Sequence, residues 1–154
     1  MLSPKEIKTF IRLVKKIHSS GHELPEAVFD ALCKILPSAA CEIIVSDRKQ
    51  GFLLTYRKDK FWKGWHFPGS VLRNHEEFVG ALKRIAKEEL DSDLRFYKFL
   101  FPMNYSRGKR GHSVTFVFWC ALKGSPKTGK FFKIMPKNII AEHKQLWKKV
   151  KKFV

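Results

Sequence analysis

The chain is poor in acidic residues and in cysteine. Its 154 residues include 31 Lys and Arg but only 14 Asp and Glu, which leaves a formal net charge of +17. The three cysteines, Cys33, Cys41 and Cys120, are odd in number and form no CxxC pair. Neither a disulfide framework nor a zinc site is therefore indicated. Free thiols favour a reducing compartment, so we expect a cytoplasmic protein.

Long apolar runs, internal repeats, low-complexity tracts and linkers are also missing. No segment approaches membrane-spanning length and the N-terminus carries no apolar targeting region, so we expect no membrane partner. The composition, 44 % apolar and 14 % aromatic, is sufficient for one sizeable core. We predict a single domain over residues 1–154.

The few acids are concentrated in one place. Residues 74–93 carry six acids against three bases, whereas residues 123–154 carry ten Lys against the single Glu142. Local negative charge suits a cation site, and the basic remainder suits a polyanionic ligand such as a nucleotide. The Lys-rich end could also hold nucleic acid. A solvated surface is the alternative interpretation of the same lysines.

A helix that carries adjacent carboxylates follows a Pro68-Gly69 turn. Asn74 with Glu77 three residues later has the form of a capping box, and apolar residues recur at helical spacing up to Leu90. The pattern predicts a helix from about His75 to Leu90, with Asn74 as N-cap. Glu88 and Glu89 would then project from its last turn, where a bound Mg²⁺ offsets the unfavourable helix dipole.

This segment resembles the signature of the Nudix hydrolases, which places a Gly and a Glu before Arg-Glu-aliphatic-x-Glu-Glu-x-Gly. The positions that match are Gly69, Glu76, Arg84, Glu88 and Glu89, with Gly69 one residue before the formal first position. The positions that depart are Ser70, Ile85 and Asp91, where the family has Gly, Glu and Gly.

The resemblance implies an α/β fold, a Nudix-type α/β/α sandwich with a mixed sheet, with the turn, loop and helix of the signature over residues 68–92. It also implies a hydrolase that uses Mg²⁺, with Mn²⁺ as a substitute, and cleaves nucleoside diphosphates linked to another group. Glu88, Glu89 and the Gly69 carbonyl would hold the metal. Arg84 would fix Glu88 or touch phosphate, and Glu76 would be structural.

Ile85 lacks an acid that ordinary members carry, and the GDP-mannose mannosyl hydrolases are similar there. Glu42 and Arg57 also match substrate-binding positions of that branch. Glu142-His143, which precede a Trp, resemble its metal ligand and general base. The match is incomplete because Glu88, which that branch lacks, is present. Attack at phosphorus and attack at the sugar's anomeric carbon therefore both stay open.

The remaining elements follow from periodicity and turn residues. We predict helices from Pro4 to near Gly21 and from Pro25 to Leu36, an extra N-terminal segment (residues 1–37) packed on the domain. A hairpin is expected over 41–47 and 51–57, with strands over 94–101 and 113–122, the second of them central. The basic loop between these last two strands offers substrate contacts through Tyr105, Arg107 and Arg110.

Two functions stay open at this point. The first is a Nudix hydrolase of nucleotide derivatives, nucleotide sugars included. The second is a non-catalytic Nudix-fold module that binds nucleotide or nucleic acid through its basic surface. Family members are often dimers, so a homodimer is a further expectation from the resemblance.

Overall fold

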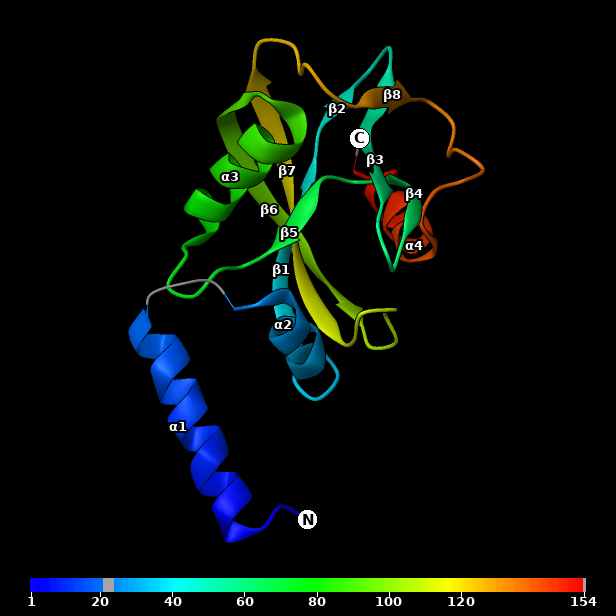
Figure 1. Cartoon of the computed structure of the whole chain (residues 1–154). Helices are drawn as coiled ribbons and strands as arrows, with labels where there is room; N and C mark the ends of the chain where they lie inside the picture. Colours follow the sequence, from blue (N-terminus) through cyan, green and yellow to red (C-terminus); the bar gives the residue numbers. More distant parts are fainter. Residues whose placement is uncertain (21–23, 154) are drawn as a thin grey trace.

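The computed structural model describes residues 1–20 and 24–153, and in those ranges it contains four helices and two sheets (Figure 1). The helices are α1 (Pro4–Ser20), α2 (Glu26–Cys33), α3 (Phe78–Leu90) and α4 (Ala141–Val150). The strands are β1 (Ser38–Ile44), β2 (Ser46–Asp47), β3 (Gly51–Lys58), β4 (Lys63–His66), β5 (Gly69–Val71), β6 (Asp93–Tyr105), β7 (Ser113–Lys123) and β8 (Lys130–Phe132). None of the described helices is long and apolar enough to cross a bilayer.

The first sheet is mixed, in the order β5-β1-β7-β6. β1 runs parallel to β7, while β5 and β6 are antiparallel to their neighbours. β7 is therefore an inner strand, as its continuous apolar run predicts. In the second sheet β3 pairs with β2, β4 and β8.

The predicted hairpin is wrong in its first strand. β1 belongs to the first sheet, and only the short β2 (Ser46–Asp47) pairs with β3. The chain changes sheets at Val45, whose carbonyl accepts a hydrogen bond from the Leu53 N–H at 2.9 Å. The cause lies in β1 itself, whose last residues are buried on both faces. β1 pairs with β5 on one edge and β7 on the other, so neither edge is left to form a hairpin with β3.

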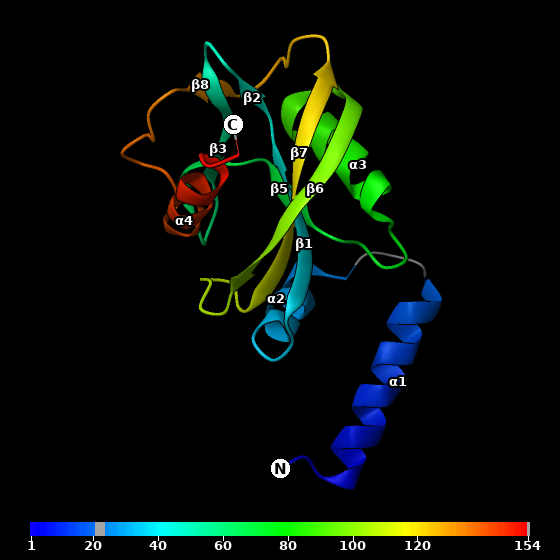
Figure 2. The same cartoon turned by 180° about the vertical axis from the view of Figure 1, so that it is seen from behind.

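Two apolar cores lie on opposite faces of β1. Ile43 and Ile44 are both fully buried, but successive side chains of a strand point to opposite faces. Ile43 belongs to the cluster that contains Leu82 of α3, and Ile44 to the cluster that contains Leu146 of α4. Figure 2 shows α3 and α4 on the two sides of the first sheet. The predicted α/β sandwich with a mixed sheet and flanking helices is confirmed.

The helix of the signature begins later than predicted. α3 starts at Phe78, with Glu77 rather than Asn74 at the N-cap position and no side-chain capping bond. His75 has a φ of 59°, a left-handed conformation that cannot continue a helix. Glu76 instead accepts a hydrogen bond from the Arg73 N–H at 3.0 Å. The predicted end at Leu90 is confirmed.

The second helix is shorter than predicted and covers less. α2 ends at Cys33, so Ile35 and Leu36 lie beyond it and are 71 % and 57 % exposed. The predicted end of this helix at Leu36 is therefore wrong. α2 contacts the rest of the chain through the buried Cys33 and through Asp30, which forms an ion pair with Arg110 at 3.2 Å.

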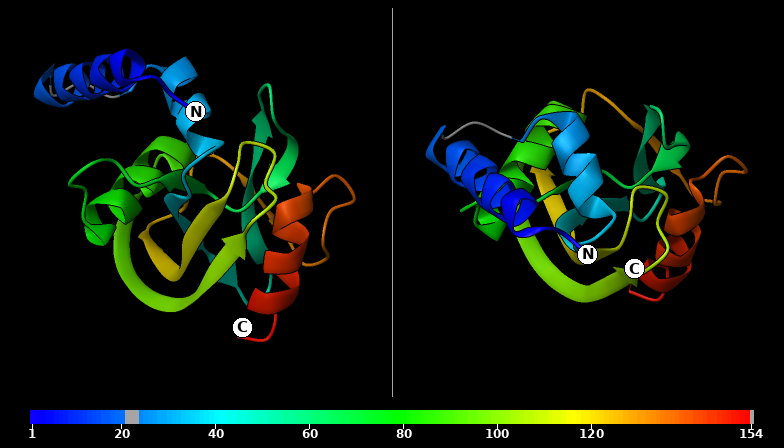
Figure 3. Two further views of the ribbon diagram at one scale, coloured as in Figure 1. Left: turned by 90° about the horizontal axis from the view of Figure 1, so that it is seen from below. Right: turned by 60° about the horizontal axis from the view of Figure 1, so that its bottom comes forward.

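α1 extends away from the sheets (Figure 3). Its apolar side chains, among them Phe10 and Val14, stay about half exposed. The prediction that the whole of residues 1–37 packs on the domain is therefore wrong for α1. Gly21, near which this helix was predicted to end, lies outside the described residues.

Candidate active site

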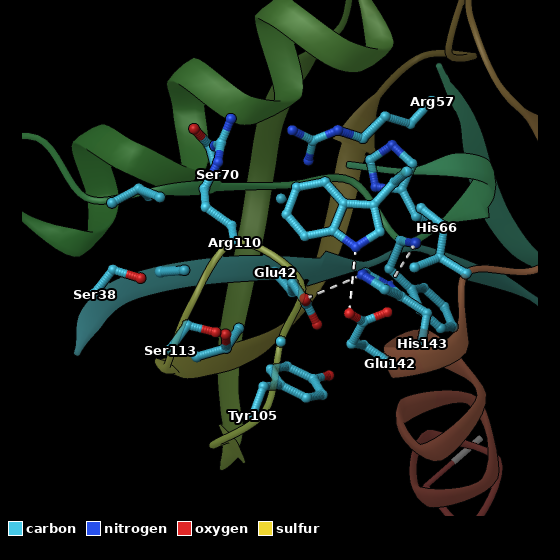
Figure 4. A pocket seen from close by; sticks show the side chains of 18 of the residues that line it. Ser38, Glu42, Arg57, His66, Ser70, Tyr105, Arg110, Ser113, Glu142 and His143 are labelled. Carbon is cyan, nitrogen blue, oxygen red and sulfur yellow. Dashed lines mark hydrogen bonds and ion pairs between the residues drawn. The ribbon is translucent and has the colours of Figure 1, made fainter. Parts of the chain in front are cut away.

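A cavity of about 580 Å³ opens between β1, β3, β5, the end of α3, the loop after β6 and the start of α4 (Figure 4). The predicted site residues that line it are Glu42, Arg57, Gly69, Glu89, Tyr105, Arg110, Glu142 and His143. Three predicted residues, Arg84, Glu88 and Arg107, do not line it. Residues far apart in the sequence thus meet in one cavity.

Glu89 is fixed by two donors. The Gly69 N–H donates to its Oε1 at 3.0 Å, and the Thr55 hydroxyl donates to its Oε2 at 3.1 Å. Because Thr55 uses its hydrogen on Glu89, its oxygen is left to accept from the Nε2–H of His66 at 3.1 Å. Burial raises the pKa of Glu89 to about 7, against the effect of these hydrogen bonds.

Thr55 and His66 were not singled out from the sequence. They face each other across the β3–β4 ladder, and only that pairing brings the hydroxyl to the carboxylate. The sequence contains only a weak indication that His66 belongs to the site, namely that it is the first of the residues that lead into the Pro68-Gly69 turn.

Gly69 lies where two strands approach closely. A Cβ at this position would come within 2.7 Å of the Glu42 Cγ and 2.8 Å of the Cys41 carbonyl oxygen. Gly69 lies opposite Glu42 in the antiparallel ladder of β5 and β1. The neighbouring residues form the ladder hydrogen bond there, from the Ile43 N–H to the Pro68 carbonyl, so Gly69 and Glu42 exchange no hydrogen bond with each other. The N–H and C=O of Gly69 therefore point away from β1, and the N–H reaches Glu89.

Glu88 points out of the cavity. Its side chain is 51 % exposed and lies 3.4 Å from the guanidinium of Arg84 and 3.5 Å from that of Arg73. Glu89, the next residue on the helix, faces inward. Adjacent helical residues point about 100° apart, so only Glu89 lines the cavity; the use of Glu88 as a metal ligand stays a prediction.

Arg84 is a structural residue in this arrangement. It makes a bidentate pair with Glu76, with both nitrogen–oxygen distances at 2.7 Å. It also donates to the Ser70 hydroxyl at 3.2 Å and to the Val71 carbonyl at 3.1 Å. The guanidinium ties the loop to α3 outside the cavity, and the catalytic role of Arg84 stays a prediction. Glu76 has a structural role, as expected, because its carboxylate binds Arg84.

A second acidic group lies opposite Glu89. Glu42 is 7 % exposed, and burial, together with the charges of Glu89 and Glu142, raises its pKa to about 8. The Tyr105 hydroxyl lies close enough to oppose this rise, although the two groups do not meet the geometry of a hydrogen bond. One carboxylate oxygen each of Glu42 and Glu142, both Oε2, is buried with no hydrogen-bond partner among the described residues, as is the Tyr105 hydroxyl. The Oε1 of Glu142 accepts from the Trp62 indole N–H at 3.3 Å.

His143 is held as a donor rather than a base. Its Nδ1 accepts from the Phe67 N–H at 3.1 Å, which leaves the hydrogen of the neutral ring on Nε2, 3.5 Å from the Oε1 of Glu42. Burial lowers the pKa of His143 to about 3. The lone pair of Nδ1 is thus engaged in this geometry, and the role of His143 as general base stays a prediction.

The open side of the cavity is cationic and aromatic. The Arg57 guanidinium lies 4.5 Å from the Trp62 ring centre and is paired with Asp59. Arg110 lies 4.8 Å from the ring centre of Phe61, in addition to its ion pair with α2. Arg107 is exposed and does not line the cavity, and its contact with substrate stays a prediction.

The three departures from the signature have structural explanations. Ser70 supplies the hydroxyl that Arg84 contacts. Ile85 is fully buried in the core beneath α3, so apolar packing replaces the acid there. Asp91 takes a left-handed conformation (φ 43°) at the C-cap, which Gly adopts at less cost, and its carboxylate pairs with Lys87 and Lys127.

The donors in the cavity suit a divalent cation, although they are not gathered into a finished site. No cluster of three or more His, Cys, Asp or Glu at ligand spacing occurs within residues 1–20 and 24–153. The partnerless buried oxygens of Glu42 and Glu142 are nevertheless hard, anionic donors. Figure 4 shows both carboxylates directed into the same part of the cavity.

The fold and this site define a class that comparisons identify. The family model described as the NUDIX domain matches residues 36–152, so the chain belongs to the NUDIX domain family. Nudix hydrolases generally use divalent metal ions. No curated protein sequence matches the chain.

Solved structures share the fold at low identity. The MutT NUDIX hydrolase from Burkholderia pseudomallei is 20 % identical, with a TM-score of 0.65 over 75 % of this chain and 98 % of its own. The NUDIX domain of Shewanella oneidensis NrtR, complexed with ADP ribose, is 19 % identical, with a TM-score of 0.60 over 84 % and 99 %. A MutT structure from work on Aliivibrio salmonicida and Vibrio cholerae is 16 % identical, with a TM-score of 0.61 over 77 % and 100 %.

Proposed function

We propose that the chain is a Mg²⁺-dependent hydrolase of nucleoside diphosphate derivatives, with Mn²⁺ able to substitute. The observation that carries the proposal is the inward arrangement of Glu42, Glu89 and Glu142 around one cavity. Two of these carboxylates keep a buried oxygen without a partner among the described residues. Buried carboxyl groups that lack a partner are costly as anions unless a proton or a cation neutralises them.

The cation would be held by Glu42, Glu89, Glu142 and the Gly69 carbonyl, which lies on the same edge of β5 as the N–H that reaches Glu89. This set replaces the predicted use of Glu88. When bound, such a cation neutralises phosphate charge and lowers the pKa of a water molecule. The Thr55 and Gly69 donors hold Glu89 in place, which keeps its carboxylate oriented without substrate.

The chain's own residues supply the substrate contacts. Arg57 and Arg110 line the cavity on its cationic side, and a guanidinium matches the geometry of phosphate oxygens. Trp62 lies beside both guanidinium groups, so an aromatic surface adjoins the phosphate contacts and suits a nucleobase. Nucleotide sugars fit this combination of an acidic interior and a cationic rim.

We propose attack at phosphorus rather than at the anomeric carbon. The mannosyl hydrolase mechanism implied by the resemblance needs a histidine base, and the Nδ1 of His143 is engaged by Phe67. Its Nε2–H faces Glu42 and helps to orient that carboxylate.

The test is a hydrolysis panel of nucleotide sugars and dinucleotides in Mg²⁺ or EDTA, with phosphate, nucleoside monophosphate and free sugar measured separately. Glu89→Gln should reduce kcat by about 100-fold or more, since even groups that only orient metal ligands are worth about 10- to 100-fold. The adjacent Glu88→Gln is the matched control and should stay within about threefold of the parent chain. Equal loss in both variants would refute the assignment of Glu89, and free sugar as the product would refute attack at phosphorus.

A binding module without turnover is the second candidate. Ile85, fully buried, removes one carboxylate of the signature, and the NUDIX domain of NrtR was solved with ADP ribose bound. Calorimetric binding of ADP ribose, with no product released in Mg²⁺ or Mn²⁺ across the panel, would favour this candidate. If the chain binds RNA in a salt-sensitive way, and Glu89→Gln leaves that affinity unchanged, the Lys-rich segment is the binding surface of the module.

A further inference from the structure

α1 presents an apolar face that nothing in the described chain covers. Ile7, Phe10, Ile11, Leu13 and Val14 are between 45 % and 50 % exposed. They lie on one side of the helix, because residues three and four apart share a face. The helix stands away from the sheets in Figures 1 and 2. A continuous apolar face of this kind indicates a binding surface.

The opposite side of α1 is strongly basic. At about 100° per residue, the basic residues fall on the side away from the apolar face, and they are Lys5, Lys8, Arg12, Lys15 and Lys16. The single acid is Glu6, and with five bases the helix carries a net charge of +4, His18 being counted as neutral. The segregation of apolar and basic side chains is thus nearly complete.

The helix is capped by its own residues. The Ser3 N–H and hydroxyl both lie 2.7 Å from the Glu6 Oε2, and the Glu6 N–H donates to the Ser3 hydroxyl at 3.4 Å. This reciprocal arrangement is a capping box, which stabilises a helix without contacts from the domain. The only acid of α1 is therefore engaged at the N-terminus.

Charge decides between the partners that could cover this face. A second copy would bring two helices of net charge +4 together, in a chain of net charge +17. Nucleic acid would neutralise the lysines but would leave the apolar side chains in water. An anionic bilayer surface satisfies both faces: apolar side chains enter the boundary between headgroups and acyl chains, and the cations stay among anionic headgroups.

We propose that α1 is a membrane-surface helix that lies in the plane of an anionic phospholipid bilayer. Five cations within its 17 residues prevent it from crossing the hydrocarbon core. The expectation of no membrane partner rested on spanning length, which does not test this mode of contact. The surface is separate from the cavity, so the proposal does not depend on the hydrolase activity.

The test is co-sedimentation of the full chain with phosphatidylcholine vesicles, prepared with and without phosphatidylserine. We expect binding to the anionic vesicles, weakened by salt. The double variant Phe10→Gln/Val14→Gln should lower the lipid partition coefficient at least about tenfold, from the loss of buried apolar area. Lys8→Gln/Arg12→Gln/Lys15→Gln should lower it by about 100-fold, since each cation near the surface is worth about fivefold.

Ile134→Gln is the matched control, because Ile134 is an exposed apolar residue (83 %) outside α1. It should leave the partition coefficient unchanged, and far-UV circular dichroism should show α1 intact in every variant. Equal binding to neutral vesicles, or no loss in Phe10→Gln/Val14→Gln, would overturn the proposal. So would a lipid-free dimer that the same variant converts to monomer in light scattering, because a second copy would then cover the face.

Discussion

Glu76→Gln should destabilise the fold although Glu76 lies outside the cavity. Its carboxylate makes two 2.7 Å hydrogen bonds to Arg84, and the two side chains are only 14 % and 11 % exposed. The variant keeps the shape of the side chain but removes its charge. A guanidinium held between loop and helix then loses its counter-ion, which is the costly way to break such a pair.

The magnitude follows from the pKa of Glu76. The Arg84 hydrogen bonds hold that pKa at about 2, against an ordinary 4.5. Since one pKa unit corresponds to about 1.4 kcal/mol, the ceiling is about 3 kcal/mol, and partial contact with solvent reduces it to about 2 kcal/mol. The pKa is depressed in the folded state, so the stabilisation is complete above pH 4.5 and is lost as pH falls through about 2.

Urea unfolding of the parent chain and of Glu76→Gln measures this difference across a pH series. The gap in unfolding free energy should be about 2 kcal/mol near neutral pH and should close between about pH 4.5 and pH 2. Glu77→Gln is the matched control, because Glu77 is exposed and its side chain makes no capping bond. A gap below about 0.5 kcal/mol, or one that does not change with pH, would refute the reasoning.

Three further substitutions test other parts of the signature. Gly69→Ala should cost about 1 to 3 kcal/mol in thermal unfolding and reduce hydrolysis, because the new methyl group meets Glu42 at 2.7 Å; unchanged activity would contradict the close approach. Asp91→Gly should change stability by less than about 1 kcal/mol, since relief of the left-handed conformation offsets two exposed ion pairs; a large loss of thermal stability would be inconsistent with this. Ile85→Glu should restore the signature letter yet unfold the chain, because a carboxylate would enter the core; circular dichroism that shows a stable fold would contradict the packing.

The sequence predicted the fold class and most of the cavity because both depend on strong local patterns. The apolar run in β7 and the periodicity of α3 are each visible without a structure. Glu42, Arg57 and Glu142 came from the resemblance, and all three line the cavity. The resemblance relates these three residues only by their order along the chain. The folded structure is what brings their side chains close together.

The features that the sequence did not show depend on contacts that a linear pattern does not contain. Glu88 and Glu89 are equivalent as letters, but the helix turns only Glu89 toward Gly69. His143 has the form of a base until the Phe67 N–H is known to occupy its Nδ1. The helix start was misplaced because Asn74 has capping chemistry, while the left-handed His75 cannot be foreseen from propensity.

The distribution of acids gives the strongest physical case for a cation in the cavity. In a chain of net charge +17, electrostatic attraction favours the placement of the 14 acids beside lysines on the surface. Glu42 is instead 7 % exposed, beside Glu89 and Glu142, and keeps one oxygen without a partner among the described residues. An apolar residue there would stabilise the uncomplexed fold, because burying a carboxylate without compensation is unfavourable. The stability lost to this arrangement is regained when a proton, or a cation in its place, neutralises the carboxylate, which is the behaviour of a binding site and not of a core.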